Sequence, residues 1–224
     1  MTSTQTRQPP RSVAALEAKG LTFSYDKSAP VLSGWSARFE PGETVALTGV
    51  SGRGKSTALY MLGLMLKPDE GTIELNGLDA TGESDRARAQ LRASLFGFVF
   101  QDAALDSSRT VLDNVTEAAL YRNQDRRELR DRANQLLHQM GVELDLDRKP
   151  GQVSGGQAQR IALCRALVGS PQILLADEPT GNLDRESSDV VVSALVGHAA
   201  QGGTVIIVTH DPAVAEQCDR SISL

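Results

Sequence analysis

Alternating apolar and polar positions mark the first part of the chain. The stretches LEAKGLTFSY, from Leu16, and VLSGWSARFE, from Val31, alternate in the way that half-buried strands do. The turn EPGE then leads into TVALTG, and GTIELNG, from Gly71, predicts another short strand. These segments predict a region that is rich in β-strands.

Near-continuous apolar runs mark a second kind of strand. LFGFVF, QILLADEP and TVIIVTHD, which begin at positions 95, 172 and 204, have the pattern of parallel strands that are buried on both faces. A helix is predicted from about Asp184 to Ala200, between the last two runs, and another in STALYMLGLML, from Ser56. This order predicts an α/β core with a parallel sheet, beside which the early strands form an antiparallel β annex.

The segment between the core strands has a different period. From Val111 to about Met140 apolar positions recur at helical spacing among many charges, and Gly141 follows. We therefore predict a helical subdomain, inserted at about residues 102–170 of a single domain that covers residues 13–224. The stretch YRNQDRRELRDRANQ, from Tyr121, interleaves Arg with Asp and Glu, which favours a solvated helix face with internal ion pairs.

Composition narrows the class of protein. The 224 residues suffice for a large core and contain no internal repeat, so one nucleotide-binding unit per chain is expected. The polar opening MTSTQTRQPPRS predicts a flexible tail over residues 1–12 instead of a signal peptide, so export is not expected. No apolar run reaches the roughly 18–20 residues of a membrane span, and the net charge of −5 argues against nucleic-acid binding. Cys164 and Cys218 lack metal-type spacing and are expected to be reduced, as in a cytoplasmic protein.

One motif predicts a phosphate-binding loop. GVSGRGKS, from Gly49, fits G-x-x-x-x-G-K-[ST] and lies between a predicted strand and a predicted helix. Its glycines let backbone N–H groups approach phosphate oxygens, Lys55 supplies a positive charge, and Ser56 offers a hydroxyl to Mg²⁺. ATP and Mg²⁺ are therefore the expected ligands. The residues expected to contact them are Gly49, Ser51, Gly52, Arg53, Gly54, Lys55, Ser56 and Thr57.

Polar residues follow two of the predicted core strands. ILLADE ends in Asp177, which we expect to hold Mg²⁺ partly through water, and Glu178, which we expect to polarise the water that attacks the γ-phosphate. Taken alone, this acidic pair could equally cap the turn that follows. His210 comes directly after TVIIVT and is predicted to be functional, because open α/β sheets bind ligands at the carboxyl ends of their strands.

Two further positions leave alternatives open. Gln101 ends LFGFVFQ, where it could reach Mg²⁺ or the attacking water, or could simply terminate a strand. Tyr25 closes LTFSY, where it could stack on adenine, or could belong to the core as aromatic residues in strands usually do. His138 and His198 are expected to be ordinary surface or core residues.

A second candidate anion site lies in QVSGGQAQRIALCRAL, from Gln152. Here a Ser and two Gly precede an amphipathic helix, and such a helix N-terminus has free N–H groups that can hold an anion. Because the chain already has a phosphate-binding loop, this second site raises the question of which anion it serves.

Together these residues resemble the ATP-binding subunit of the ABC transporters over nearly the whole chain, from about Val13. The motifs in the order typical of that family are Tyr25, GVSGRGKS, Gln101, VSGGQ, ILLADE with GNLD, and His210. The resemblance implies a P-loop ATPase that works as a head-to-tail dimer with two ATP molecules sandwiched between the copies. It implies that Asp184, in GNLD, communicates between the two sites. It also implies that the γ-phosphate bound by one copy is contacted by VSGGQ of the other copy, through Ser154, Gly155, Gly156 and Gln157.

The resemblance further implies a membrane partner. ATP binding would close the dimer and hydrolysis would reopen it, and the segment after Gln101 would receive a coupling helix from a separate permease at the cytoplasmic face of the membrane. GNLD, LFGFVFQ and TVLDNV are similar to the branch that includes lipoprotein-release, macrolide and peptide export, and cell-division ATPases, which works by mechanotransmission. The alternatives are an ATPase that regulates a cell-wall hydrolase through a membrane partner and, less favoured, a soluble ATPase of DNA repair or translation.

The sequence departs from the family pattern in a few places. Arg53 stands where a small residue is usual, and it could point to solvent or contact the partner subunit. Val153 replaces the usual Leu of the signature, and AALDSS replaces Leu-Leu-Pro after Gln101, which weakens any inference about which permease fits. A C-terminal regulatory domain is not expected after SISL.

Overall fold

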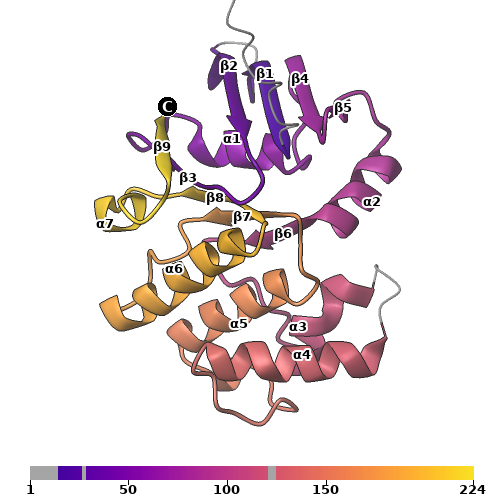
Figure 1. Cartoon of the computed structure of the whole chain (residues 1–224), viewed down its shortest axis with the longest axis vertical. Coiled ribbons are helices and arrows are strands. Elements are labelled where there is room, and N and C mark those ends of the chain that lie inside the picture. The colour runs from indigo at the N-terminus through magenta and orange to yellow at the C-terminus, as the bar shows by residue number, and fades with distance from the viewer. Residues whose placement is uncertain (1–14, 27–28, 121–124) are drawn as a thin grey trace, which may run out of the picture.

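The computed structural model describes residues 15–26, 29–120 and 125–224. The tail predicted over residues 1–12 lies outside them. Within the described ranges, none of the helices combines the length and the apolar character that crossing a membrane would require. Figure 1 shows an antiparallel sheet at one end, a parallel sheet in the middle and a group of helices at the other end.

The antiparallel sheet is the predicted β annex. Its strand order is β2-β1-β4-β5, and its strands are β1 (Leu16–Phe23), β2 (Leu32–Phe39), β4 (Glu70–Leu75) and β5 (Leu78–Asp79). Neighbouring strands pair antiparallel, with Leu16 opposite Phe39 on one side and Leu75 on the other. Leu16, Ala18 and Leu21 of β1 are buried, Lys19 is exposed and the other residues are partly buried, so one face of the sheet packs on the core, as the sequence pattern predicts.

The parallel sheet forms the centre of the molecule. Its strand order is β6-β7-β8-β3-β9, and its strands are β3 (Thr44–Thr48), β6 (Phe96–Val99), β7 (Ile173–Asp177), β8 (Thr204–Val208) and β9 (Arg220–Ser223). Every residue of β7 and β8 is buried, which explains their unbroken apolar runs. All of the pairs are parallel, so the carboxyl ends of these strands meet at one edge.

Helices cover both faces of the parallel sheet. Helix α1 (Lys55–Leu62) packs between the two sheets, where its Leu59 and Leu62 join β3 and β8 side chains in one apolar cluster. On the opposite face lie α5 (Gly155–Leu167) and α6 (Arg185–Ala200), which share a second cluster with alternate residues of β7 and β8. Helix α2 (Asp85–Leu95) precedes β6, and the short α7 (Pro212–Ala215) follows β8.

The predicted first helix is shorter than its apolar run. STALYMLGLML predicts a helix to about residue 66, but α1 ends at Leu62. Gly63 is the C-cap, and Leu64 has φ 57°, a left-handed conformation that stops helical hydrogen bonding. The Leu64 carbonyl instead accepts hydrogen bonds from the guanidinium groups of Arg88 and Arg92, at 2.6 and 2.7 Å.

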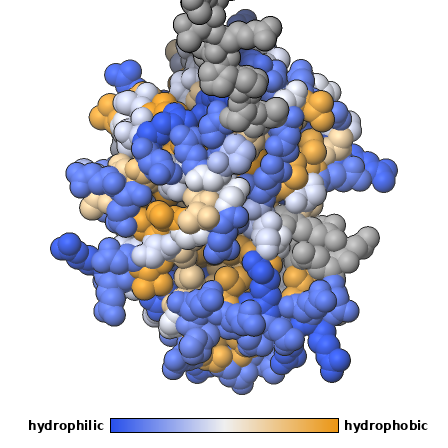
Figure 2. All heavy atoms as spheres, viewed as in Figure 1, coloured by the Kyte–Doolittle hydropathy of each residue, from blue (hydrophilic) through white to orange (hydrophobic). Residues whose placement is uncertain are grey.

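The inserted helices are α3 (Val111–Leu120), α4 (Arg126–Gln139) and α5, with the 3-10 turn Pro150–Gln152 before α5. They lie together at the lower end of the molecule in Figure 1. Gly141 has φ 62° and follows α4, as predicted. Figure 2 shows a mostly hydrophilic surface over this end, which agrees with a solvated face for the charged helix.

Candidate functional site

The phosphate loop surrounds the ammonium group of Lys55. This group donates hydrogen bonds to the carbonyl oxygens of Gly49, at 2.8 Å, and Val50, at 3.1 Å, and the residue is only 8% exposed. Gly54 has φ 84°, and a Cβ there would lie 2.9 Å from the Val31 carbonyl oxygen, so only glycine fits. The loop then enters α1 at Lys55 and aims the helix N-terminus at the loop interior. Ser51, Gly52 and Arg53 are exposed.

Asp177 is held at the end of β7 by two hydroxyl groups of α1. It is 3% exposed; Ser56 Oγ donates to its Oδ1 at 3.0 Å, and Tyr60 Oη donates to its Oδ2 at 2.9 Å. Burial raises the pKa of the carboxyl group, and the two hydrogen bonds act in the opposite direction. The structure therefore brings together two residues that the sequence predicted as metal ligands, Ser56 and Asp177.

Tyr60 is a site residue that the sequence analysis missed. Its pKa is raised to about 12, mainly by burial and then by the neighbouring Asp177 carboxyl, so the phenol keeps its proton and acts as a donor. The available signal was its spacing: Tyr60 comes four residues after Ser56, which places both side chains on one face of a helix.

Glu178 and His210 meet at the carboxyl edge of the sheet. His210 Nδ1 lies 2.9 Å from Glu178 Oε1, with the His side chain 70% exposed and the Glu side chain 15% exposed. The hydrogen bond to Glu178, and then its charge, raises the pKa of His210. Glu178 has φ 46°, which is a strained conformation for a residue with a side chain, and its N–H donates to the Val208 carbonyl oxygen.

Tyr25 and Thr57 link the antiparallel sheet to the phosphate loop. Strand β1 ends at Phe23, so Tyr25 lies just beyond the strand, 67% exposed, and it is not a core residue. Its hydroxyl is 3.2 Å from Thr57 Oγ1, and its ring packs edge-on against Phe23. An exposed aromatic ring beside the loop favours stacking on a base over a role in the core.

Gln101 lies exposed just beyond the carboxyl end of β6. Helix α5 holds the backbone on both sides of it. Gln159 Nε2 donates to the Phe100 carbonyl oxygen at 3.0 Å, and Arg165 donates to the carbonyl oxygens of Ala103 and Ala104, at 2.9 and 2.8 Å. The loop that carries Gln101 is therefore anchored to the helix that follows VSGGQ.

The VSGGQ segment lies apart from the phosphate loop. Ser154 caps α5: its Oγ accepts from the Gln157 N–H at 3.2 Å, and Gln157 Oε1 accepts from the Ser154 N–H at 3.0 Å. Gly155 and Gly156 open the helix on the face of the sheet opposite α1, so this helix start and the phosphate loop lie in different layers of one copy.

Asp184 caps α6 and connects it to α5. Its carboxylate accepts from the Ser187 N–H at 2.8 Å and from Ser187 Oγ at 3.0 Å, and Arg160 of α5 donates to the same Oγ at 2.8 Å. The hydrogen bonds from Ser187 lower the pKa of Asp184. His198 accords with an ordinary structural role, since its Nε2 lies 3.0 Å from the Pro171 carbonyl oxygen, and His138 is exposed on α4.

The donor set suits a triphosphate with a hard cation. The loop offers backbone N–H groups and one ammonium group to phosphate oxygens, and the adjacent hydroxyl and carboxylate oxygens are the ligands that Mg²⁺ prefers. Among the described residues, no group of three or more His, Cys, Asp or Glu side chains could hold a metal by itself, so a cation here would need oxygens from phosphate or water as well.

Comparison with known proteins gives the family. Residues 32–181 match the family model described as ABC transporter. The macrolide export ATP-binding/permease protein MacB of Salmonella choleraesuis is 42% identical over 214 residues, which are 94% of this chain and 33% of that protein. MacB of Escherichia coli K12 is 43% identical over 212 residues, with 93% and 33% covered. The chain thus spans about a third of the length of these relatives.

Solved structures agree with this assignment. A dimeric structure of the ABC transporter cassette MJ0796 superposes with a TM-score of 0.87 at 34% identity, and the match covers 93% of this chain and 94% of that one. A dimeric post-hydrolysis state of MJ0796, bound to ADP and phosphate, gives a TM-score of 0.86 at 33% identity. With its phosphate loop, its acidic pair and its two sheets, the chain belongs to the ABC transporter family, as an ATP-hydrolysing cassette of the α/β type.

Proposed function

We propose that this cassette powers a membrane permease of the MacB-like export branch, as one half of a head-to-tail ATP-sandwich dimer. The observation that carries the dimer proposal is the separation of the two anion sites. The phosphate loop and the acidic pair lie at one edge of the sheet, whereas the start of α5 lies in the layer on the other face. Within one copy, the start of α5 and the phosphate loop therefore do not share a layer.

The residues at the strand ends divide the work of hydrolysis. Lys55 and the loop N–H groups hold the β- and γ-phosphates, and Tyr25 stacks on adenine. Glu178 accepts a hydrogen bond from the attacking water, and His210 fixes the Glu178 carboxylate in the required orientation. Gln101 reaches from the anchored loop toward this water.

Mg²⁺ is the proposed cation of the site. Ser56 and Asp177 would hold it, with water completing its shell, and the bound ion would neutralise charge on the phosphates. The Asp177 carboxyl group suits this role because it is buried and already takes a hydroxyl of the phosphate loop as a partner.

A second copy supplies the missing contact. In the proposed dimer, Ser154, Gly155, Gly156 and Gln157 of one copy face the γ-phosphate bound by the other. Support comes from MJ0796, which was solved as a dimer and, in a second structure, as a dimer with ADP and phosphate. Asp184 lies at the start of α6 and is linked by hydrogen bonds through Ser187 to Arg160 of α5. A shift of α5 at one ATP site would therefore be transmitted to Asp184 and, through it, to the other ATP site.

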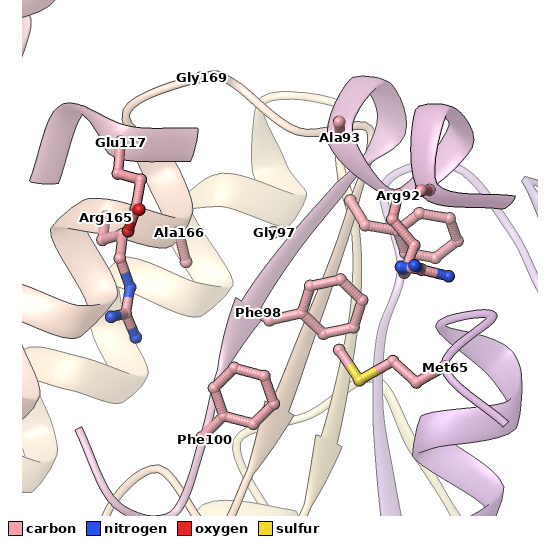
Figure 3. A pocket seen from close by; sticks show the side chains of 12 residues that line it. Met65, Arg92, Ala93, Gly97, Phe98, Phe100, Glu117, Arg165, Ala166 and Gly169 are labelled. Carbon is pink, nitrogen blue, oxygen red and sulfur yellow. The ribbon is translucent and has the colours of Figure 1, made fainter. Parts of the chain in front are cut away.

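An apolar groove beside Gln101 suits the permease. A cavity of about 340 Å³ lies between α2, β6, α3 and α5, where Phe98 and Phe100 form its floor with Met65 (Figure 3). The rings of Phe98 and Phe100 are stacked with centroids 6.0 Å apart. Arg165 lines the groove and also holds the loop that carries Gln101, so an apolar helix that docks here would act directly on that loop.

The proposal extends to the cargo and the location, with support from the names of the relatives. MacB is named as a macrolide export ATP-binding/permease protein, and we infer a drug, peptide or lipoprotein as the exported substrate, with the cassette at the cytoplasmic face of the membrane. The names of these relatives join an ATP-binding and a permease part in one chain. The expectation of a separate permease subunit therefore stays a prediction.

An affinity experiment tests the partner. Tagged Glu178→Gln protein, which should bind ATP without hydrolysing it, is incubated with ATP and Mg²⁺ and recovered from detergent-solubilised native membranes. We expect a membrane protein with few membrane helices and a large extracytoplasmic domain. The control is Glu178→Gln with Phe100→Glu, which places a charge in the groove and should lose this protein while it keeps ATP binding.

The other outcomes identify other functions. A many-helix permease would reassign the chain to a conventional transporter, and a cell-wall hydrolase in the recovered complex would favour the regulatory alternative. Equal recovery with the Phe100→Glu control would show that the groove is not the docking site. Recovery of no membrane protein would contradict the transporter proposal and favour a soluble ATPase.

A further inference from the structure

Tyr60 lies beside the proposed cation site, and neither the phosphate loop nor the acidic pair accounts for it. It lies on α1 one helical turn after Ser56, so both hydroxyls face β7 from the same side of the helix. Each hydroxyl takes a different oxygen of Asp177: Ser56 Oγ donates to Oδ1 at 3.0 Å and Tyr60 Oη donates to Oδ2 at 2.9 Å.

The two hydrogen bonds are not equivalent. The Ser56 hydroxyl belongs to the phosphate loop and is itself a proposed ligand of the cation, so its oxygen would serve the cation while its proton bonds to Oδ1. The Tyr60 hydroxyl is on the opposite oxygen and needs no rearrangement. It can keep the carboxylate plane fixed and leave Oδ1 to Ser56 and to the cation or its water.

The burial of Asp177 strengthens the effect of its hydrogen bond with Tyr60. Asp177 is 3% exposed, so little water is available to compete for its Oδ2 atom. Without a donor on Oδ2, the buried carboxylate would lose a hydrogen bond and could rotate about its last bond. A carboxylate that is fixed in advance loses less freedom on binding a metal, and such outer partners of metal ligands commonly change the metal affinity by about 10–100-fold.

We propose that Tyr60 is a positioning residue for a divalent cation at Asp177, which tightens Mg²⁺ binding by fixing the carboxylate through its Oδ2 atom. The proposal rests on the proposed use of Mg²⁺ at this site. It assigns Tyr60 no contact with the nucleotide or with the reacting atoms, so its effect should be on the metal and not on ATP alone.

The test is a thermodynamic cycle that needs no turnover. The dissociation constant of a fluorescent, non-hydrolysable ATP analogue is measured in excess Mg²⁺ and in EDTA, and the ratio of the two constants gives the factor by which Mg²⁺ tightens binding. By linkage, the same factor describes how the protein tightens Mg²⁺ binding to the nucleotide. Tyr60→Phe removes only one oxygen atom and keeps the ring, so the fold should be retained.

We expect Tyr60→Phe to lower this factor about tenfold while the constant in EDTA stays within about twofold of wild type. Ser56→Ala, which removes the other hydroxyl on Asp177, should also lower the factor. Thr116→Val is the matched control, since it removes a hydroxyl that donates to the Leu112 carbonyl oxygen within α3 and should leave the factor unchanged. Mn²⁺ in place of Mg²⁺ gives a spectroscopic check, because the bound fraction seen by electron paramagnetic resonance should fall in Tyr60→Phe.

Contrary results separate the two levels of the proposal. An unchanged factor in Tyr60→Phe would overturn the positioning role. This includes the case in which the dissociation constants in Mg²⁺ and in EDTA rise together, because an equal rise would place Tyr60 in the nucleotide pocket. If wild type itself shows no tightening by Mg²⁺, the proposed cation site fails, and the role of Tyr60 fails with it.

Discussion

At the scale of single residues, Glu178 combines a strained backbone with a restrained side chain. Its φ of 46° carries a cost of order 1–3 kcal/mol for a residue other than glycine. The conformation is held by its N–H, which donates to the Val208 carbonyl oxygen at 2.9 Å, and by its carboxylate, which meets His210. Together these contacts restrain the carboxylate beside His210, with the Glu178 side chain 15% exposed.

The first prediction concerns the titration of His210. Because its hydrogen bond to Glu178 raises its pKa, the imidazole should titrate above its usual value near 6.5 in the folded protein. In Glu178→Gln the charge is lost, and the pKa should move back toward that usual value. NMR titration of the imidazole signals measures both pKa values.

The same experiment contains its control. Burial lowers the pKa of His198, whose partner is the Pro171 carbonyl oxygen, so its signal should titrate below the usual value in both proteins. The sign for stability follows from the raised pKa of His210. Its pair with Glu178 adds stability that is fully present below the unfolded pKa and is lost as the pH rises through the folded pKa. An unshifted His210 signal would contradict the pairing.

At this scale, sequence could predict where these residues lie in the fold but not how they are held. The acidic pair, His210 and the phosphate loop were placed at strand ends by their apolar neighbours alone. The left-handed backbone of Glu178 has no local signal, because a Glu before Pro is not a residue that favours positive φ. Sequence could not single out Tyr60, because a tyrosine in an apolar helix has the pattern of a core residue. Its hydrogen bond to Asp177 depends on the packing of α1 against β7, which the sequence does not show.

At the scale of elements, α5 is the part that connects the others. Its first residues form the VSGGQ cap, its middle bonds to α6 through Arg160, and its last turn holds the Gln101 loop through Arg165. A shift of this helix would therefore move the VSGGQ segment and Gln101 together. The groove for the proposed permease lies against the same last turn.

The second prediction tests this anchor. Arg165→Leu removes the donors for the carbonyl oxygens of Ala103 and Ala104, and it should lower the free energy of unfolding by about 1–3 kcal/mol. Urea denaturation measures this loss. Hydrogen exchange should also rise in the backbone around residues 101–104, because the loop would lose its attachment to α5.

The control for this prediction is Arg130→Leu on α4. Arg130 is exposed, so its loss should change the free energy of unfolding by less than about 0.5 kcal/mol. If Arg165→Leu is equally mild, and exchange in the loop does not change, the hydrogen bonds of Arg165 do not hold the loop in solution.

Elements with strong periods were predictable and weak ones were not. The strands β7 and β8 and the helices α5 and α6 match their patterns closely, because long buried faces impose a clear period. The strand β9 has mostly exposed residues and exists only because it pairs with β3 at the sheet edge. Helix α2 is largely polar, and its Ser84 cap is a weak signal without an apolar run.

At the scale of the whole molecule, the separation of the phosphate loop from the start of α5 is the central feature. One copy has its phosphate loop in one layer and, in another layer, the start of α5, which is the proposed phosphate cradle (Ser154, Gly155, Gly156 and Gln157). Sequence could list both sites but could not place them in different layers, because their positions depend on how the helices pack across the sheet. In a two-fold dimer each interface patch is used twice, so one geometry would complete both sites at once.

The third prediction separates the dimer from the fold. A Cβ at Gly155 would meet no atom within 4 Å, so Gly155→Asp fits the folded chain, and its negative charge at the start of α5 should keep or raise the stability of the monomer. The same charge would repel a γ-phosphate delivered by a partner. In the Glu178→Gln background, we therefore expect light scattering to show a dimer with ATP and Mg²⁺, and only monomer once Gly155→Asp is added.

Mixing two inactive chains then tests the head-to-tail arrangement. The phosphate loop of Lys55→Ala should no longer bind ATP, and the cradle of Gly155→Asp should no longer accept the partner's γ-phosphate. Neither variant should therefore hydrolyse ATP alone. A mixed dimer pairs the intact loop of one chain with the intact cradle of the other, and random mixing should restore up to about a quarter of the wild-type rate, because half of the dimers are mixed and each has one good site. If Gly155→Asp alone keeps its activity, the cradle does not serve a partner's phosphate. If instead each chain used its own α5 for its own ATP, both chains would stay inactive in a mixed dimer, and mixing would restore no activity.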